Sequence, residues 1–156
     1  MKVGLISDTH GMLRPEVFGA LDGVDLILHA GDVGRHDIIV GLEAIAPVHA
    51  VLGNTDRPAL LPHVPDELTL ELEGSRVVLV HGHRLGAPTA ARLRASYPAA
   101  DIVVYGHTHR QRVDELDGCL FVNPGAAGAA RFHLRPAVAV LELRRGSKPV
   151  VRQIVL

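Results

Sequence analysis

Two residues near the start of the chain, Asp8 and His10, are of types that bind metal ions. They follow the apolar, β-branched run 3–6, which is typical of a strand buried on both faces. Residues two apart in an extended chain point to the same side, so we expect the Asp8 carboxylate and the His10 imidazole to converge on one point. These two side chains therefore predict half of a metal site.

Further polar residues of the same kinds follow other apolar runs of the chain. Carboxylate and amide oxygens mixed with imidazole nitrogens suit Mn, Fe, Zn, Ni or Co, and the absence of thiolates among them argues against a structural zinc site. Their number exceeds what one ion binds, whereas two ions that share one carboxylate, with a bridging water or hydroxide, fit it. The candidate metal ligands are Asp8, His10, Asp32, Asn54, His81, His107 and His109.

Strands and helices must bring these residues together. Apolar runs and alternating patterns predict strands over 3–6, 26–30, 48–52, 68–74, 77–80, 102–105, 112–116, 120–122, 137–143 and 150–155. Helical spacing and the positions of prolines predict helices over 14–20, 36–45 and 90–97 and an irregular segment over 57–65. The early alternation of strands and helices indicates a parallel sheet, and the later hairpins indicate antiparallel additions. Ligands of open α/β sheets bind beyond the carboxyl ends of strands, which is where the candidate ligands lie.

The composition narrows the classes of protein to consider. The length of 156 residues fits one domain spanning 1–156. A net charge of -1, no Trp, two Tyr and three Phe offer little to a polyanion or to stacked bases, so we expect no long nucleic acid as partner. The single Cys119 cannot form an intramolecular disulfide and is expected in the core. No run is long enough for a signal peptide or a membrane span, so we expect a cytoplasmic protein with no membrane partner.

Five short blocks, each closing an apolar strand, resemble those of the calcineurin-like metallophosphoesterases and, within them, the small YfcE-like phosphodiesterases. The resemblance covers about residues 1 to 125. It implies a four-layer αββα sandwich, in which two mixed sheets pack face to face between outer helices. The blocks are Asp8-Thr9-His10-Gly11, Gly31-Asp32, Gly53-Asn54-Thr55-Asp56, His81-Gly82-His83 and Gly106-His107-Thr108-His109.

The resemblance also implies a ligand set and an activity. One ion would be held by Asp8, His10, Asp32 and His109, and the second by Asp32, Asn54, His81 and His107, with Asp32 bridging. Two divalent cations, with Mn²⁺ expected ahead of Ni²⁺, Zn²⁺, Fe²⁺ or Co²⁺, leave roughly +2 beside two carboxylates, which activates a bridging water and attracts a phosphate. The chain is therefore predicted to be a metal-dependent phosphoesterase, and more narrowly a phosphodiesterase acting on a small phosphodiester.

One position departs from the pattern of the wider family. Many members carry His after the Gly-Asn pair, where it contacts phosphate and protonates the leaving group, but this chain has Thr55. A hydroxyl can donate a hydrogen bond to a phosphoryl oxygen but is a weak acid at pH 7. YfcE-like proteins also lack this His, so we predict an enzyme that depends on a good leaving group. The candidate catalytic residues are Asn54, Thr55, Asp56 and His83, the last because it lies two residues after His81 on the same side of an extended chain.

Several residues have ordinary structural explanations as well. His29 is expected to be a buried hydrogen-bonding residue, and Asn123 lies either in a loop beside the site or in an ordinary turn. Arg57 and Arg131 could contact phosphate or simply be exposed. His36, His49, His63 and His133 have no motif partners and are expected to be surface or structural residues. Two other functions remain open: a non-catalytic interaction scaffold such as the retromer subunit of this fold, and a nuclease for short nucleic acids. Homodimers are expected by analogy only.

Overall fold

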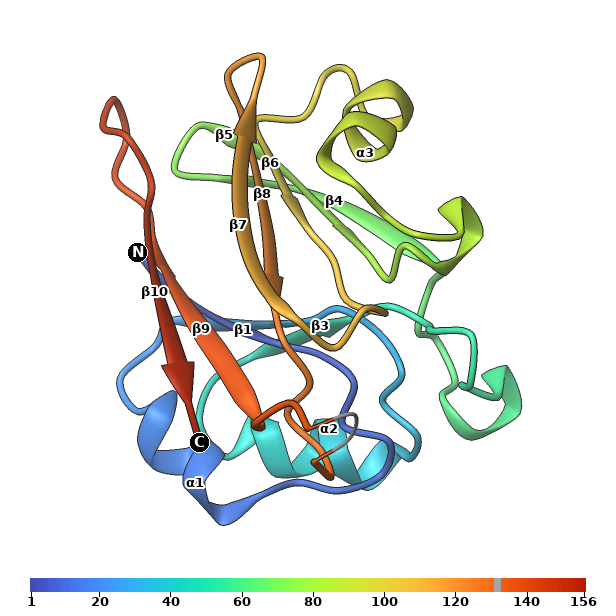
Figure 1. Ribbon diagram of the computed structural model, residues 1–156. Helices are drawn as coiled ribbons and strands as arrows, with labels where there is room; N and C mark the ends of the chain where they lie inside the picture. Colours follow the sequence, from blue (N-terminus) through green and yellow to red (C-terminus); the bar gives the residue numbers. More distant parts are fainter. Residues whose placement is uncertain (131–132) are drawn as a thin grey trace.

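Two mixed β-sheets form the centre of the protein, whose computed structural model describes residues 1–130 and 133–156 (Figure 1). The first sheet contains β1 (Lys2–Ile6), β2 (Leu26–His29), β3 (Val48–Ala50), β9 (Ala137–Glu142) and β10 (Val150–Val155). Its strand order is β10-β9-β1-β2-β3. The strands β1, β2 and β3 run parallel, and β9 and β10 are antiparallel additions, as the sequence predicts.

The second sheet is built in the same mixed way. It contains β4 (Glu67–Leu72), β5 (Ser75–Val80), β6 (Ile102–Val104), β7 (Gln111–Leu116) and β8 (Cys119–Pro124). Its order is β4-β5-β6-β8-β7. The central strands β5, β6 and β8 are parallel, and the hairpins β4–β5 and β7–β8 form its two sides.

Helices cover the outer faces of both sheets. The α-helices are α1 (Pro15–Ala20), α2 (His36–Glu43) and α3 (Ala90–Ser96), and the short 3-10 helices are η1 (Pro58–Leu60) and η2 (His83–Leu85). Figure 1 shows α1 and α2 on the outside of the first sheet and α3 on the outside of the second. The predicted four-layer sandwich of two mixed sheets with flanking helices is confirmed.

Three apolar layers hold the sandwich together, because neighbouring strand residues point to opposite faces. Leu5 of β1 and Leu79 of β5 belong to the layer between the sheets. Ile6 belongs to the layer under α1 and α2, whereas Val78 packs with Leu93 of α3. Leu5, Ile6, Leu79 and Leu93 are fully buried, and each such side chain contributes about 1.5–3 kcal/mol. This packing fixes the strand ends from which the candidate ligands project.

The predicted elements agree with the structure apart from their ends and two short additions, one of which is η1 within the segment expected to be irregular. The helix α2 ends two residues earlier than predicted, because the amides of Ala44 and Ile45 bond three residues back in turn geometry. The strand β3 also ends two residues early, because the Leu52 amide donates to Pro65 O in the irregular segment. Neither of the 3-10 helices η1 and η2 was predicted. No helix in the described ranges is long and apolar enough to cross a membrane.

Candidate metal centre

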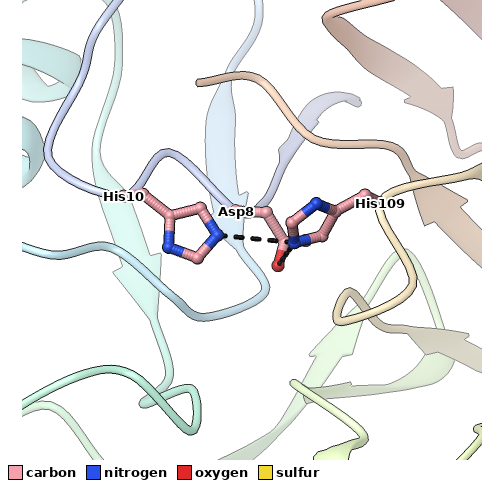
Figure 2. A group of neighbouring side chains, drawn as sticks. All are labelled: Asp8, His10 and His109. Atoms are coloured by element: carbon pink, nitrogen blue, oxygen red, sulfur yellow. Dashed lines mark hydrogen bonds and ion pairs between the residues drawn. The ribbon is translucent and has the colours of Figure 1, made fainter. Parts of the chain in front are cut away.

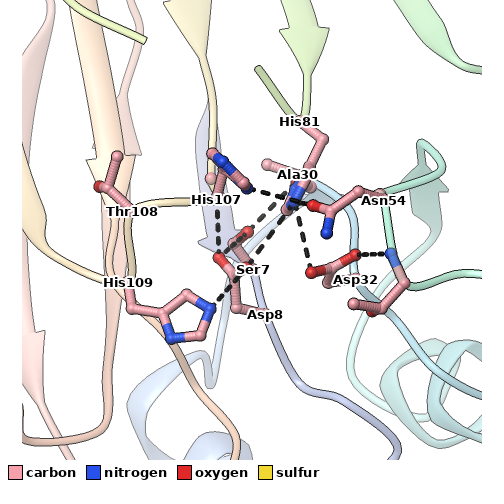
Figure 3. A network of polar contacts seen from close by, with 12 residues as sticks. Ser7, Asp8, Ala30, Asp32, Asn54, His81, His107, Thr108 and His109 are labelled. Atoms are coloured by element: carbon pink, nitrogen blue, oxygen red, sulfur yellow. Dashed lines mark hydrogen bonds and ion pairs between the residues drawn. The ribbon is translucent and has the colours of Figure 1, made fainter. Parts of the chain in front are cut away.

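The loops after five parallel strands meet at one end of the two sheets (Figure 3). They carry all of the predicted ligands: Asp8 and His10 after β1, Asp32 after β2, Asn54 after β3, His81 after β5, and His107 and His109 after β6. Each of these side chains lies within 4 Å of another member of the set. The strand ends that the sequence singles out therefore form one cluster in space.

Asp8, His10 and His109 form the first group of this cluster (Figure 2). The Asp8 Oδ1 atom lies 3.2 Å from His109 Nε2, and His10 Nε2 lies 3.4 Å from the same nitrogen. Two ligands at about 2.1 Å from one ion are roughly 3.0–3.4 Å apart in octahedral or tetrahedral geometry. The spacing of these three side chains therefore fits a single bound cation.

The second group contains Asp8, Asp32 and His81, with the Asn54 amide beside it. Asp32 Oδ2 lies 3.4 Å from His81 Nε2, and Asn54 Oδ1 lies 3.1 Å from both His81 Nε2 and His107 Nδ1. Asp32 Oδ2 also lies 3.8 Å from His10 Nε2, which belongs to the first group. Asp8 and Asp32 thus both lie between the groups, and the assignment of Asp32 as the bridging ligand stays a prediction.

The backbone around the ligands differs from the extended geometry expected of Asp8 and His10, and that expectation is wrong. The φ angles are +54° at Asp8, +48° at His10, +52° at Asp32, +70° at His107 and +59° at His109. Left-handed backbone costs roughly 1–2 kcal/mol for a residue with a Cβ, and such strain is concentrated at functional sites. Here it is imposed by bonds between loops, since the amides of Asp8 and His10 donate to Gly31 O at 3.0 Å and Asp32 O at 2.8 Å.

The two carboxylates each have one oxygen held by the protein. Asp8 Oδ2 accepts hydrogen bonds from Ser7 Oγ at 2.6 Å and from the His107 amide at 3.2 Å. Asp8 Oδ1 is buried and accepts no hydrogen bond from the described residues. Asp32 Oδ1 accepts from the Thr55 amide at 2.9 Å, which leaves Oδ2 toward the imidazoles. A buried carboxylate oxygen without a donor calls for a cation, so the residues present fit a divalent ion.

The ring of His81 is held in one tautomer. Its Nδ1 lies 2.7 Å from Ala30 O, so this nitrogen carries the proton and Nε2 presents its lone pair to the cluster. Gly31 makes this approach possible: a Cβ at this residue would lie 2.7 Å from His81 Nδ1, and its φ of +90° also favours glycine.

The negative charges of Asp8 and Asp32 favour a positive charge at the centre of the cluster. Burial raises the pKa of Asp32, but the hydrogen bond and charge of His81 outweigh this and hold the pKa well below its usual range. Burial lowers the pKa of His81. The hydrogen bond to Asp32 and the charges of Asp8 and Asp32 together raise it by more, so the net shift of this pKa is upward. The carboxylates therefore favour a second proton on His81, at Nε2, and a metal ion bound to this nitrogen would take the place of that proton.

Of the residues predicted to be catalytic, Asn54 lies with the second ligand group, whereas Thr55 and Asp56 lie beside the cluster. The Thr55 hydroxyl lies 3.4 Å from His10 Nδ1, on the side of that ring away from the cluster. Asp56 accepts the amides of Val33 at 3.1 Å, Gly34 at 2.7 Å and Gly53 at 2.8 Å. Asp56 therefore joins the loop that follows β2 to the loop that follows β3. Its role is to position these loops, which carry Asp32 and Asn54.

The extended chain expected between His81 and His83 is wrong, because Gly82 has a φ of +95° and His83 begins η2. The turn nevertheless leaves the His83 ring 5.4 Å from the ring of His81 and 6.3 Å from that of His107. Burial, followed by the charges of His81, Arg84 and His107, lowers the pKa of His83, and the opposing effect of Asp32 is smaller. His83 is therefore a neutral imidazole at the edge of the cluster.

Three further residues support the site: Ser7 and Thr9 were not assigned to it from the sequence, and Asn123 was left open between a loop beside the site and an ordinary turn. Ser7 and Thr9 flank Asp8, and Thr9 Oγ1 lies 2.9 Å from Nε2 of the fully buried His29. Asn123 donates to Gly106 O at 2.8 Å and to Thr108 Oγ1 at 3.1 Å. Asn123 thus holds the loop that carries His107 and His109. Hydroxyl residues next to a predicted ligand were the available signal for Ser7 and Thr9.

The remaining predictions concern residues away from the cluster. His29 is a buried hydrogen-bonding residue and Cys119 is a buried free thiol, as predicted. Arg57 is exposed, and Arg131 lies outside the described residues. The four surface histidines are confirmed as exposed: His36, His49, His63 and His133.

Comparison with known proteins identifies the family. The model of the calcineurin-like phosphoesterase superfamily domain matches residues 1–146, and the chain belongs to this superfamily. A protein named probable metallophosphoesterase from Methanothermobacter thermautotrophicus is 38% identical, over 99% of this chain and 98% of its own length. Phosphodiesterase YfcE of Escherichia coli is 31% identical, over 81% of this chain and 79% of its own.

Solved structures show the same fold. An archaeal phosphodiesterase superposes with a TM-score of 0.80 at 25% identity, covering 100% of both chains. Vps29 of Entamoeba histolytica in complex with zinc gives a TM-score of 0.82 at 23% identity over 99% of each chain, a likeness that shows the fold alone. The named relatives and the two ligand groups support a metal-dependent phosphoesterase, a hydrolase of the family that the sequence predicts.

Proposed function

We propose that this protein is a phosphodiesterase that uses two divalent metal ions at neighbouring positions. The observation that carries the proposal is the buried Asp8 Oδ1, which lacks a hydrogen-bond donor and lies within 4 Å of an imidazole nitrogen of each ligand group. One isolated ion would leave part of this continuous set of ligands without a partner. The proposal assigns Asp8, His10, Asp32 and His109 to one ion and Asp32, Asn54, His81 and His107 to the other.

Bound divalent ions would supply the Lewis acidity that activates water and neutralises charge on the phosphoryl oxygens. The chain supplies the geometry for this chemistry. Ser7 and the His107 amide orient Asp8, the Thr55 amide orients Asp32, and Ala30 O orients His81. Because these contacts hold the ligands before substrate arrives, little reorganisation is needed during the reaction.

The same residues explain why a diester with a good leaving group is the proposed substrate. Thr55 replaces the histidine that could protonate a leaving alkoxide, and its hydroxyl is a weak acid. His83 is neutral and lies near His81 and His107, so its ring N–H can donate one hydrogen bond to a phosphoryl oxygen. In this proposal Asn54 orients the phosphate through its amide and Asp56 fixes the loop that carries Asn54.

Metal content and substrate preference test the proposal together. The protein is stripped with chelator, dialysed and reloaded separately with Mn²⁺, Ni²⁺, Zn²⁺ or Co²⁺, and bound metal is measured by mass spectrometry. Hydrolysis of bis(p-nitrophenyl) phosphate is then compared with that of p-nitrophenyl phosphate. We expect about two ions per chain, highest turnover with Mn²⁺ and preference for the diester. One ion per chain at saturation, or preference for the monoester, would contradict the proposal.

The two other functions considered from the sequence predict different results. A scaffold with a decayed site would bind metal weakly and hydrolyse neither compound. A nuclease for short nucleic acids would cleave oligonucleotides faster than the aryl diester, with salt-dependent binding. The complete set of ligands and their ordered contacts favour the phosphodiesterase over the scaffold.

A further inference from the structure

A second cavity adjoins the cluster at the seam between the two sheets. It measures about 330 Å³ and is lined by His109, Arg110, Gln111, Leu134, Arg135 and Val155. We call it the Arg110–Arg135 pocket. One of the lining residues is His109, whose Nε2 lies 3.2 Å from Asp8 Oδ1, so the pocket and the cluster share a residue. A molecule bound at the cluster can therefore extend into this pocket.

The position of the pocket is fixed by the residue at its base. Gln111 begins β7 in the second sheet, and its Nε2 donates to Val138 O of β9 at 3.0 Å and to Ile154 O of β10 at 3.3 Å. The side chain thus ties the start of β7 to two strands of the first sheet. Arg110, directly before Gln111, is held at the mouth of the pocket by this connection.

The pocket carries positive charge without compensation. None of the described residues that line it is acidic. In the two described stretches of the chain, neither Arg110 nor Arg135 forms an ion pair, although Arg35, Arg84 and Arg112 do. Both side chains are exposed, so their donors are available to a ligand. Arginine guanidinium groups favour phosphate and carboxylate because their paired N–H groups match two oxygens.

The rest of the lining indicates the shape of the ligand. Leu134 and Val155 contribute apolar surface to the lining beside the two arginines. A ligand that fills the pocket would therefore carry an apolar or sugar-like part and, beyond it, an anionic group. The scissile phosphate belongs at the metal ligands, so this anion would be a second one on the same substrate.

We propose that the Arg110–Arg135 pocket binds a second phosphate of the substrate, so that preferred substrates are small phosphodiesters with an additional phosphate on one alcohol. This inference rests on the proposed phosphodiesterase function and specifies its substrate class. The contact is made equally before and during the reaction, so it acts on KM rather than on kcat.

The test compares two chromogenic diesters that release the same alcohol. One is the p-nitrophenyl ester of thymidine 5′-phosphate, and the other carries a further phosphate on the 3′ hydroxyl. We expect the wild-type protein to prefer the second by at least about tenfold in kcat/KM through a lower KM. In the double variant Arg110→Gln/Arg135→Gln this preference is expected to disappear, while kcat/KM for the first substrate and the metal content stay unchanged.

The matched control is Arg145→Gln, which removes an equal charge from the turn between β9 and β10, at the other end of these strands. It should leave the preference intact. Diester hydrolysis without a preference, or a preference that survives in the double variant, would overturn the inference and leave the phosphodiesterase function standing.

If no diester is hydrolysed, the proposed phosphodiesterase function is refuted. A binding experiment still tests the Arg110–Arg135 pocket in that case. Isothermal titration calorimetry measures the affinity of thymidine 3′,5′-bisphosphate for the metal-loaded wild type and the double variant. A roughly tenfold lower affinity of the double variant than of the wild type supports the pocket. Equal affinities in wild type and double variant refute it.

Discussion

The buried Oδ1 of Asp8 lies 3.2 Å from Nε2 of His109, and the two side chains come from loops of different sheets. Asp8 follows β1 of the first sheet, whereas His109 follows β6 of the second. His81, which follows β5, approaches Asp32 after β2 in the same way, at 3.4 Å. The cluster therefore joins the two halves of the sandwich, and filling it should affect the stability of the whole domain.

We expect metal ions to raise the melting temperature. An ion that binds only the folded state raises the free energy of unfolding by about 2.7 kcal/mol at a concentration 100 times its dissociation constant. For a domain of this size this corresponds to a rise of roughly 5–10 °C. Differential scanning calorimetry of chelator-treated protein, with and without Mn²⁺, measures the shift. Equal melting temperatures at saturating Mn²⁺ would show that the cluster does not bind metal in the folded state.

The substitution Asp32→Asn should weaken both metal positions. It removes the negative charge that lies 3.4 Å from His81 and 3.8 Å from His10 while keeping the size of the side chain. We expect a loss of at least about 100-fold in kcat and fewer than two ions bound per chain. The control is Asp22→Asn, an exposed residue in the turn after α1. Full metal content and turnover in Asp32→Asn would contradict the bridging assignment.

Removing the Ser7 hydroxyl should affect metal affinity without removing a ligand. Ser7 Oγ donates to Asp8 Oδ2 at 2.6 Å, so the variant Ser7→Ala frees the carboxylate to rotate. We expect metal affinity to fall roughly 10- to 100-fold, as for other residues that orient ligands. Competition with a fluorescent chelator measures it, and Ser96→Ala at the end of α3 is the control. An unchanged affinity would mean that the His107 amide alone orients Asp8.

Thr55 should make the rate depend steeply on the leaving group. With no strong acid beside the scissile bond, aryl diesters with low leaving-group pKa should react much faster than alkyl diesters. A plot of log kcat against leaving-group pKa for a series of substituted phenols gives the slope. Thr55→His should flatten the plot by supplying a proton donor. A flat plot for the wild-type enzyme would refute this account of Thr55.

His29 should make the metal-free protein less stable in acid. Burial lowers the pKa of His29 from 6.5 to about 4. Between these values the unfolded state binds more protons than the folded state, so the free energy of unfolding rises with pH across this window. Stability from this group is full above pH 6.5 and declines as pH falls toward 4, by about 3 kcal/mol in total.

Urea unfolding in the presence of chelator measures this pH dependence. Other groups titrate in the same range, and His81, whose pKa is raised, acts in the opposite direction because its contribution is lost as pH rises. The comparison of wild type with His29→Gln isolates His29, since Gln keeps a hydrogen-bonding group for Thr9 and does not titrate. Parallel stability curves for the two proteins between pH 4 and 6.5 would contradict the prediction.

The positions of the ligands along the chain were predictable because each follows a buried strand. The apolar run 3–6 and the motif at 106–109 identify strand ends, and parallel strands bring their carboxyl ends to one edge. The same runs predicted parallel strands with antiparallel additions, whereas the four-layer arrangement was implied by the resemblance to the metallophosphoesterases. Local pattern was sufficient wherever burial alone determined the structure.

The directions of the side chains were not predictable from local pattern. Asp8 and His10 were expected in extended geometry, but bonds to the distant loop 31–33 hold both in left-handed backbone. The pocket beside His109 likewise depends on distant segments, because its lining comes from residues 109–111, 134–135 and 155. Such contacts are set by the packing of the two sheets, which single-sequence patterns do not describe.

The left-handed backbone of the ligand residues restricts how this centre could change over generations. Valine, isoleucine or threonine at Asp8, His10, Asp32, His107 or His109 would clash with their own backbone, whatever their chemistry. Glycine and asparagine tolerate this conformation. A homologue that lost metal binding while keeping the fold should therefore carry glycine or asparagine at these positions. Such a pattern would identify a homologue that has lost catalytic activity.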